Sequence, residues 1–140
     1  DCQGIIMSIQ TKSEVFPRFN EFDSYGILHH MTYFSWLEFS RYEFFKYLGF
    51  DLKQLFLDGC YFVLLESNVV YHRMISGFNT YYITCTVDKE NHTDSKITLI
   101  QTVLDKNNKK FITGRIVLAI VQNNKLKLKL PNDIILKLRK

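Results

Sequence analysis

The sequence predicts a single domain of the α+β class, in which one long helix packs on an antiparallel β-sheet. Apolar residues recur at helical spacing from His30 to Leu48, and apolar and polar residues alternate in several later segments, as they do in strands. The chain has 140 residues, of which 46% are hydrophobic, and this suffices for one core. We therefore expect one domain over residues 1–140, with residues 1–10 as a flexible leader or a cloning remnant.

The first predicted elements are an edge strand and two helices. Residues 11–19 alternate well enough for a strand that ends near Pro17, because proline cannot donate a hydrogen bond to a neighbouring strand. The long helix over residues 30–48 has one buried stripe, formed by Tyr33, Leu37, Ser40, Phe44, Tyr47 and Leu48. Gly49 favours a helix end, since glycine adopts the left-handed conformation at least cost. A short second helix is predicted over residues 52–57.

The remaining chain predicts strands over residues 61–73, 81–88, 97–104 and 110–122. In the first of them, one face is formed by Tyr61, Val63, Leu65, Val69 and Tyr71. Residues 105–108 have the sequence Asp-Lys-Asn-Asn, which is typical of a tight turn, so the last two strands form a hairpin. Both faces of 110–122 are apolar, which predicts a second subunit over the sheet. Pro131 precedes a predicted terminal helix over 132–140.

Charge is concentrated at the C-terminal end. The net charge is +4, and residues 125–140 alone contribute +5. Such a tail can bind nucleic acid, an anionic membrane or the phosphates of a nucleotide-like ligand, or it can be a solvated end. Three scattered cysteines without disulfide spacing predict a reducing compartment, the cytoplasm. The plastid of a parasite, reached after removal of a leader, is the alternative, because abundant Lys, Asn and Ile are typical of AT-rich genomes.

Three other features are not expected. The longest apolar runs, residues 61–65 and 116–121, are far shorter than the roughly 20 residues that cross a bilayer, so we expect a soluble protein. Four scattered histidines have no ligand spacing, so no metal site is predicted. Cys85 alternates with apolar neighbours, which indicates a core residue and not a nucleophile.

Residues 18–30 form the densest cluster of chemically active side chains. Glu21, Asp23, Gly26 and two histidines lie between the predicted first strand and the long helix. The free N–H groups and the positive end of a helix can polarise an acyl oxygen. The cluster is therefore either a catalytic site or a loop in which Asp23 merely caps a turn.

Several motifs between Arg18 and Arg41 match a known family signature: Arg18-Phe19, Asp23-Ser24-Tyr25-Gly26, His30, Tyr33 and Glu38-Phe39-Ser40-Arg41. With them the chain resembles the 4-hydroxybenzoyl-CoA thioesterase family, including its Tol-Pal-associated branch. The resemblance implies a hotdog fold, in which a curved antiparallel sheet wraps one long helix. It also implies hydrolysis of an acyl-CoA thioester by a homodimer or homotetramer, with no cofactor beyond the CoA of the substrate.

The resemblance further implies roles for individual residues. Asp23 would be the nucleophile or the general base, and His30 would contribute its main-chain N–H and its imidazole. The implied substrate contacts are Tyr25, Gly26 and Tyr33. From their strand positions, two further contacts are expected: Glu66, on the more polar strand face, at the partner's site, and Arg73 in a CoA groove, with a surface position as the alternative for Arg73. An acyl groove would be lined by aromatic residues such as Phe22, Tyr25 and Trp36.

Two other functions stay open. A dehydratase acting on acyl-carrier-protein substrates pairs a loop histidine with a helix carboxylate, a role that Glu38 could fill. The alternative reading of Glu38 is a structural ion pair with Arg41, three residues later on the helix. A non-enzymatic binder of RNA or an anionic membrane would use the tail around Lys125 and Lys127. The motif from Asp23 to Gly26 favours hydrolysis over dehydration. The sequence has no recognisable aromatic stacking platform or glycine-rich phosphate loop, which disfavours the binder.

Overall fold

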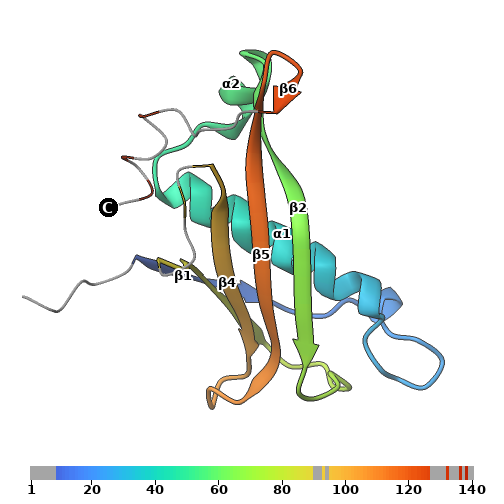
Figure 1. Ribbon diagram of the computed structural model, residues 1–140. Coiled ribbons are helices and arrows are strands. Elements are labelled where there is room, and N and C mark those ends of the chain that lie inside the picture. Colours follow the sequence, from blue (N-terminus) through green and yellow to red (C-terminus); the bar gives the residue numbers. More distant parts are fainter. Residues whose placement is uncertain are drawn as a thin grey trace, which may run out of the picture.

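The computed structural model describes residues 9–89, 93, 95–126, 132, 136 and 138. The elements in chain order are β1 Gln10–Val15, the 3-10 turn η1 Phe19–Glu21, α1 His30–Tyr47, α2 Leu52–Leu57, β2 Cys60–Tyr71, β3 Tyr81–Val87, β4 Ile97–Leu104, β5 Lys110–Gln122 and β6 Lys125–Leu126. The long helix α1 lies across one face of the sheet (Figure 1), as predicted. Residues 132, 136 and 138 are helical, and the rest of the predicted terminal helix lies outside the described residues, as do residues 1–8 of the possible leader.

The sheet is antiparallel throughout, with strand order β1-β3-β4-β5-β2 and β6 paired to the end of β5. The strand β1 ends before Pro17, earlier than predicted. The predicted hairpin between β4 and β5 is confirmed. Its turn is held by the carboxylate of Asp105, which accepts the N–H groups of Asn107 at 2.8 Å and Lys109 at 2.9 Å. The 12-residue strand β2 ends the strand order, so one of its edges has no strand partner within the described residues.

The core lies between α1 and the sheet. From the helix it takes Tyr33, Trp36, Leu37, Ser40, Phe44 and Phe45, followed by Leu48. The prediction that Tyr47 belongs to this stripe is wrong, because its side chain is 70% exposed. Tyr47 lines a surface hollow with Glu43 of α1 and with residues of β1, so its ring lies on the outer side of the helix, beside the edge of the sheet.

The sheet presents alternate residues to this core. In β3 the predicted alternation is confirmed, with Tyr81, Ile83, Cys85 and Val87 buried. Burial raises the pKa of Cys85 to about 12, against the opposing effects of Arg41 and Ser40, and this agrees with a core thiol. In β5, Gly114 lies close under the helix: a Cβ atom there would come within 3.4 Å of a Leu37 methyl group.

The prediction of which β2 residues share one face is wrong over part of the strand, because β2 contains a β-bulge. The register with β5 shifts between Leu64 and Glu66, which leaves Leu65 as the extra residue. A single extra residue reverses which side chains face the core, so Phe62 and Val69 both pack against it despite their odd separation. The residues predicted to share one face are therefore divided between the two faces of the sheet.

Candidate active site

The loop between η1 and α1 is a small hairpin. Phe22 and Leu28 form an isolated antiparallel bridge, and the N–H of His29 donates to the carbonyl of Glu21 at 2.9 Å. Residues 23–27 make the closed end, which projects beyond the start of α1 (Figure 1). The hairpin thus places Asp23 at the same end of the molecule as the N-terminus of the long helix.

Asp23 holds this hairpin together. Its N–H donates to the carbonyl of Ile27 at 2.8 Å, and its own carbonyl accepts the N–H of Gly26 at 3.0 Å. Its carboxylate oxygen Oδ1 accepts the N–H groups of Tyr25 at 2.8 Å and Ile27 at 3.1 Å. Gly26 has φ +74°, a backbone conformation that favours glycine. Asp23 therefore does cap the turn, but only through Oδ1. Within the described part of the chain, no hydrogen bond engages Oδ2.

The N-terminus of α1 has no side-chain cap. The capping position is His29, whose side chain makes no capping hydrogen bond, and the first turn contains no acidic residue. The leading N–H groups of a helix have no acceptor inside it, and they carry its positive dipole end. With no cap and no neutralising acid, these amides, beginning at His30, can stabilise a developing negative charge.

Tyr33 is buried beneath the hairpin, only 3% exposed. Its hydroxyl accepts the backbone N–H of Ile75 at 3.2 Å, and burial raises its pKa. Ile75 in turn accepts the N–H of Leu28 through its carbonyl at 2.8 Å. Tyr33 thus joins α1, the hairpin and the loop after β2. In the single chain, Tyr33 supports the hairpin through these hydrogen bonds. Its predicted contact with substrate stays a prediction. Trp36 is also in the core, at 6% exposed, which corrects its predicted place in an acyl groove.

The other predicted substrate contacts lie in different places. Tyr25 is at the tip of the hairpin and 87% exposed. Glu66 lies in β2 opposite Val117, on the sheet face away from α1, and its carboxylate is 3.8 Å from the guanidinium of Arg115. Arg73 is exposed in the loop after β2. The structure therefore holds Asp23, Tyr25 and Gly26 in one hairpin, and His30 begins the helix that follows it. A role for Glu66 or Arg73 at a partner's site stays a prediction.

A groove along α1, beside β2, was not predicted from the sequence. Two adjoining cavities of about 290 and 370 Å³ share Glu38, Arg41 and Leu64 as lining residues. The helix side of the groove also includes Phe34 and Tyr42, which are not part of the predicted buried stripe. The signal that was missed is this pair of aromatic residues, eight positions apart and therefore on one side of a helix.

Arg41 does not form the predicted ion pair with Glu38 among the described residues. Its Nη1 donates instead to Oε1 of Gln101 at 3.1 Å, and Nε2 of Gln101 donates to the carbonyl of Leu37 at 2.8 Å. Gln101 is completely buried. Burial lowers the pKa of Arg41, and the charge of Glu38 acts in the opposite direction. Arg41 and Gln101 therefore form a chain of hydrogen bonds from the lining of the groove into the core.

Two further properties follow from the described residues. No group of three His, Cys, Asp or Glu side chains among them is placed to hold a metal ion. None of the described helices combines the length and the apolar character needed to cross a bilayer. The residues 127–131 of the basic tail lie outside the described part of the chain, so binding of RNA or a membrane through this tail stays a prediction, as does the cytoplasmic compartment.

Solved structures of the same fold cover most of the chain. A DHNA-CoA thioesterase from Staphylococcus aureus has a TM-score of 0.77 at 19% identity, over 85% of this chain and 80% of its own. A probable thioesterase from Bartonella henselae has a TM-score of 0.78 at 19% identity, over 88% and 100%. Another Staphylococcus aureus protein, solved in complex with CoA, has a TM-score of 0.83 at 12% identity, over 95% and 84%. At such identities the likeness shows the fold, which is the predicted hotdog fold.

Sequence comparison shows the family. A search of curated proteins gave no match. The sequence model of the thioesterase-like superfamily matches residues 17–138, a range that includes the Asp23 hairpin, α1 and the strands β2 to β6. This match confirms the resemblance noted in the sequence and supports the thioesterase class of enzyme. The chain belongs to the thioesterase-like superfamily.

Proposed function

We propose that this protein hydrolyses an acyl-CoA thioester to the free acid and CoA. The observation that supports this proposal best is the position of Asp23, in a hydrogen-bonded hairpin beside the uncapped N-terminus of α1. Its Oδ2 oxygen is available to attack the thioester carbonyl or to take a proton from water. The leading amides of α1 can donate to the carbonyl oxygen as negative charge develops on it.

The two roles of Asp23 imply different sequences of bonds. As a nucleophile, it forms a mixed anhydride with the acyl group while the C–S bond breaks, and water then hydrolyses the anhydride. As a base, it takes a proton from water, whose oxygen adds to the carbonyl carbon before the C–S bond breaks. In both cases the CoA thiolate leaves and takes up a proton. His30, at the start of α1, is the residue that we propose for placing the water or the thiolate.

We also propose that the active form is a homodimer or homotetramer that pairs through the free edge of β2. Exposed strand edges offer unpaired backbone groups to a second strand. On β2, Leu64, Leu65, Val70 and Tyr71 are between 44 and 52% exposed. The sheet-face contact predicted from β5 is not required, because Val117 and Ala119 are already buried within the single chain.

The mass of the protein in solution tests this assembly. We expect light scattering after size-exclusion chromatography to give the mass of two or four chains. A Ser67→Pro variant should shift the mass towards one chain. The N–H of His72 donates to Phe111 beside β5, so by the alternation of an antiparallel pair the N–H of Ser67 points to the free edge, and proline removes it. A wild-type protein that runs as a monomer at all concentrations would contradict the proposed pairing.

A panel of thioesters tests the activity. Release of the CoA thiol should be measured for short, long and aromatic acyl-CoA substrates, beside hydration of a crotonyl thioester. We expect at least one acyl-CoA to be hydrolysed with kcat/KM of about 10⁴ M⁻¹s⁻¹ or more, within the ordinary range for enzymes. Hydration of the crotonyl thioester without thiol release would favour the dehydratase. Salt-sensitive RNA binding in the absence of both activities would favour the non-enzymatic binder.

A further inference from the structure

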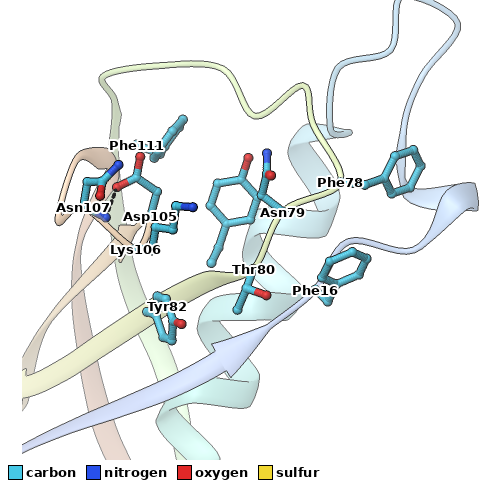
Figure 2. Close-up of a pocket in the computed structure, with 10 residues that line it drawn as sticks. Phe16, Phe78, Asn79, Thr80, Tyr82, Asp105, Lys106, Asn107 and Phe111 are labelled. Carbon is cyan, nitrogen blue, oxygen red and sulfur yellow. Dashed lines mark hydrogen bonds between the residues drawn. The ribbon is translucent and has the colours of Figure 1, made fainter.

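The sheet has a second free edge, on the strand β1. This strand is at the opposite end of the strand order from β2, and within the described residues only its β3 side has a strand partner. Figure 2 shows the blue ribbon of β1 beside β3, with Tyr82 on β3 and Phe16 just beyond the end of β1. The proposed hydrolysis and the proposed β2 contact use no side chain of β1. The β1 edge is therefore a surface with no assigned role.

A surface hollow of about 730 Å³ lies between this edge and α1. Its sheet side is formed by residues 10–14, and its helix side by Phe39, Glu43, Lys46 and Tyr47. The side chain of Phe39 is 42% exposed and that of Tyr47 is 70% exposed. The lining residues include two lysines and two glutamates, so the charges balance. Exposed aromatic side chains beside an unpaired strand edge suit an added β-strand.

The hydrogen bonds of β3 indicate which backbone groups of β1 are free. The N–H of Asp88, directly after β3, donates to the carbonyl of Thr98 at 2.8 Å, so it points towards β4. Directions alternate along an antiparallel strand, so the odd-numbered residues of β3 point towards β1. These residues lie opposite the odd-numbered residues of β1. The N–H and C=O groups of Gln10, Lys12 and Glu14 therefore point outwards from the free edge.

Two copies of β1 are complementary in one antiparallel register. Hydrogen bonds between them require that outward-pointing residues lie opposite each other. When the pair is centred on Ser13, Lys12 lies opposite the partner's Glu14, and Glu14 lies opposite the partner's Lys12. A shift of two residues in either direction places two lysines or two glutamates opposite each other instead. Opposite charges across a strand pair are stabilising and like charges are destabilising, so the charge pattern favours the register centred on Ser13.

This register places both long helices on the same face of the joined sheet. Ser13 is 8% exposed and lies opposite Ile83 of the core, so its side chain faces α1. Residues directly opposite each other in a sheet point to the same face, so the partner's Ser13 points to the same face. The hollows of the two copies are then adjacent, and the exposed rings of Phe39 and Tyr47 can be covered.

We propose that the β1 edge pairs with the β1 edge of a second copy of this chain, in the register centred on Ser13. The charged pairs between Lys12 and Glu14 lie on the outer face, where Nζ of Lys12 is 4.9 Å from the centroid of the Tyr82 ring. The strand has six residues, so the contact is smaller and weaker than a standard interface. It is independent of the proposed β2 contact. Both contacts together join dimers end to end, so the mass should keep rising at high concentration.

Sedimentation equilibrium tests the contact in a Ser67→Pro background, which is designed to remove the β2 contact. We expect the mass to rise with concentration from one chain towards two. Lys12→Glu and Glu14→Lys should each weaken this association by at least about tenfold, because either change makes both charged pairs like pairs. The double variant Lys12→Glu/Glu14→Lys should associate as strongly as its parent, since it only exchanges the two charges. The control Lys110→Glu, at the start of β5, should have no effect.

A mixture of the two single variants separates lost complementarity from misfolding. One variant has two glutamates on β1 and the other has two lysines, so the two strands are complementary to each other. An equimolar mixture should therefore regain the association that each variant loses alone. If Ser67→Pro still forms dimers, the same comparison applies to the step from two to four chains. A mixture that associates no better than its components, an equal effect of Lys110→Glu, or no self-association at the highest soluble concentration would overturn the proposal.

Discussion

Asp23→Asn should lower kcat for thioester hydrolysis by at least about a hundredfold, because a carboxylate that acts as nucleophile or base contributes that much. The thermal midpoint should stay close to that of wild type. Asparagine keeps an oxygen in place of Oδ1, so the N–H groups of Tyr25 and Ile27 retain their acceptor. What the substitution removes is the negative charge and the basicity of the second oxygen. Steady-state kinetics and thermal unfolding of the same preparation measure both effects.

Two further variants separate catalysis from turn capping. Asp23→Ala should lose the activity and also lower the free energy of unfolding by about 1 kcal/mol, since it removes the acceptor as well. Asp51 offers a matched control, because its carboxylate caps α2 by accepting the N–H of Gln54 at 3.0 Å. Asp51→Asn should leave kcat unchanged. Near-normal turnover in Asp23→Asn, with loss only in Asp23→Ala, would reduce Asp23 to a capping residue.

The second large effect is expected in the core. Gln101→Leu should lower the free energy of unfolding by about 2–4 kcal/mol, as measured by urea denaturation. Gln101 is fully buried and is bonded both to Arg41 and to the carbonyl of Leu37. Leucine has similar size but no polar atoms, so it leaves the partly buried guanidinium without its acceptor. The loss of an acceptor for a charged group is the larger part of the effect.

A double variant tests that explanation. In Arg41→Met/Gln101→Leu both partners become apolar, and replacing a whole buried polar group is far less destabilising than removing half of it. We expect the double variant to be more stable than Gln101→Leu alone, with a coupling free energy of at least about 1 kcal/mol. Strictly additive effects would show that the two side chains do not depend on each other.

The elements that the sequence predicted well are those determined by local patterns. The helix α1, the alternation in β3 and the turn at Asp105 each follow from residues that are neighbours in sequence. The buried face of β2 could not be predicted, because the bulge at Leu65 depends on its pairing with β5. Nothing in an apolar strand indicates where one extra residue will be accommodated.

The candidate site, too, could be predicted from the sequence only in part. A loop with Asp23 before a helix is visible in the sequence, because residue types and spacing alone indicate it. The contacts that support the site join residues far apart in the chain: Tyr33 and Ile75 are 42 positions apart, and Arg41 and Gln101 are 60. The groove along α1 likewise combines residues from α1, α2, β2 and β5. No periodicity connects such residues, so only the fold brings them together.

A single-turnover experiment tests the central claim most directly. With enzyme in excess over one acyl-CoA, release of the CoA thiol reports cleavage of the C–S bond without interference from product release. The account predicts rapid cleavage by wild type and cleavage slower by at least about two orders of magnitude in Asp23→Asn, with both proteins folded. Equal rates in the two proteins, or no cleavage of any acyl-CoA by wild type, would contradict it.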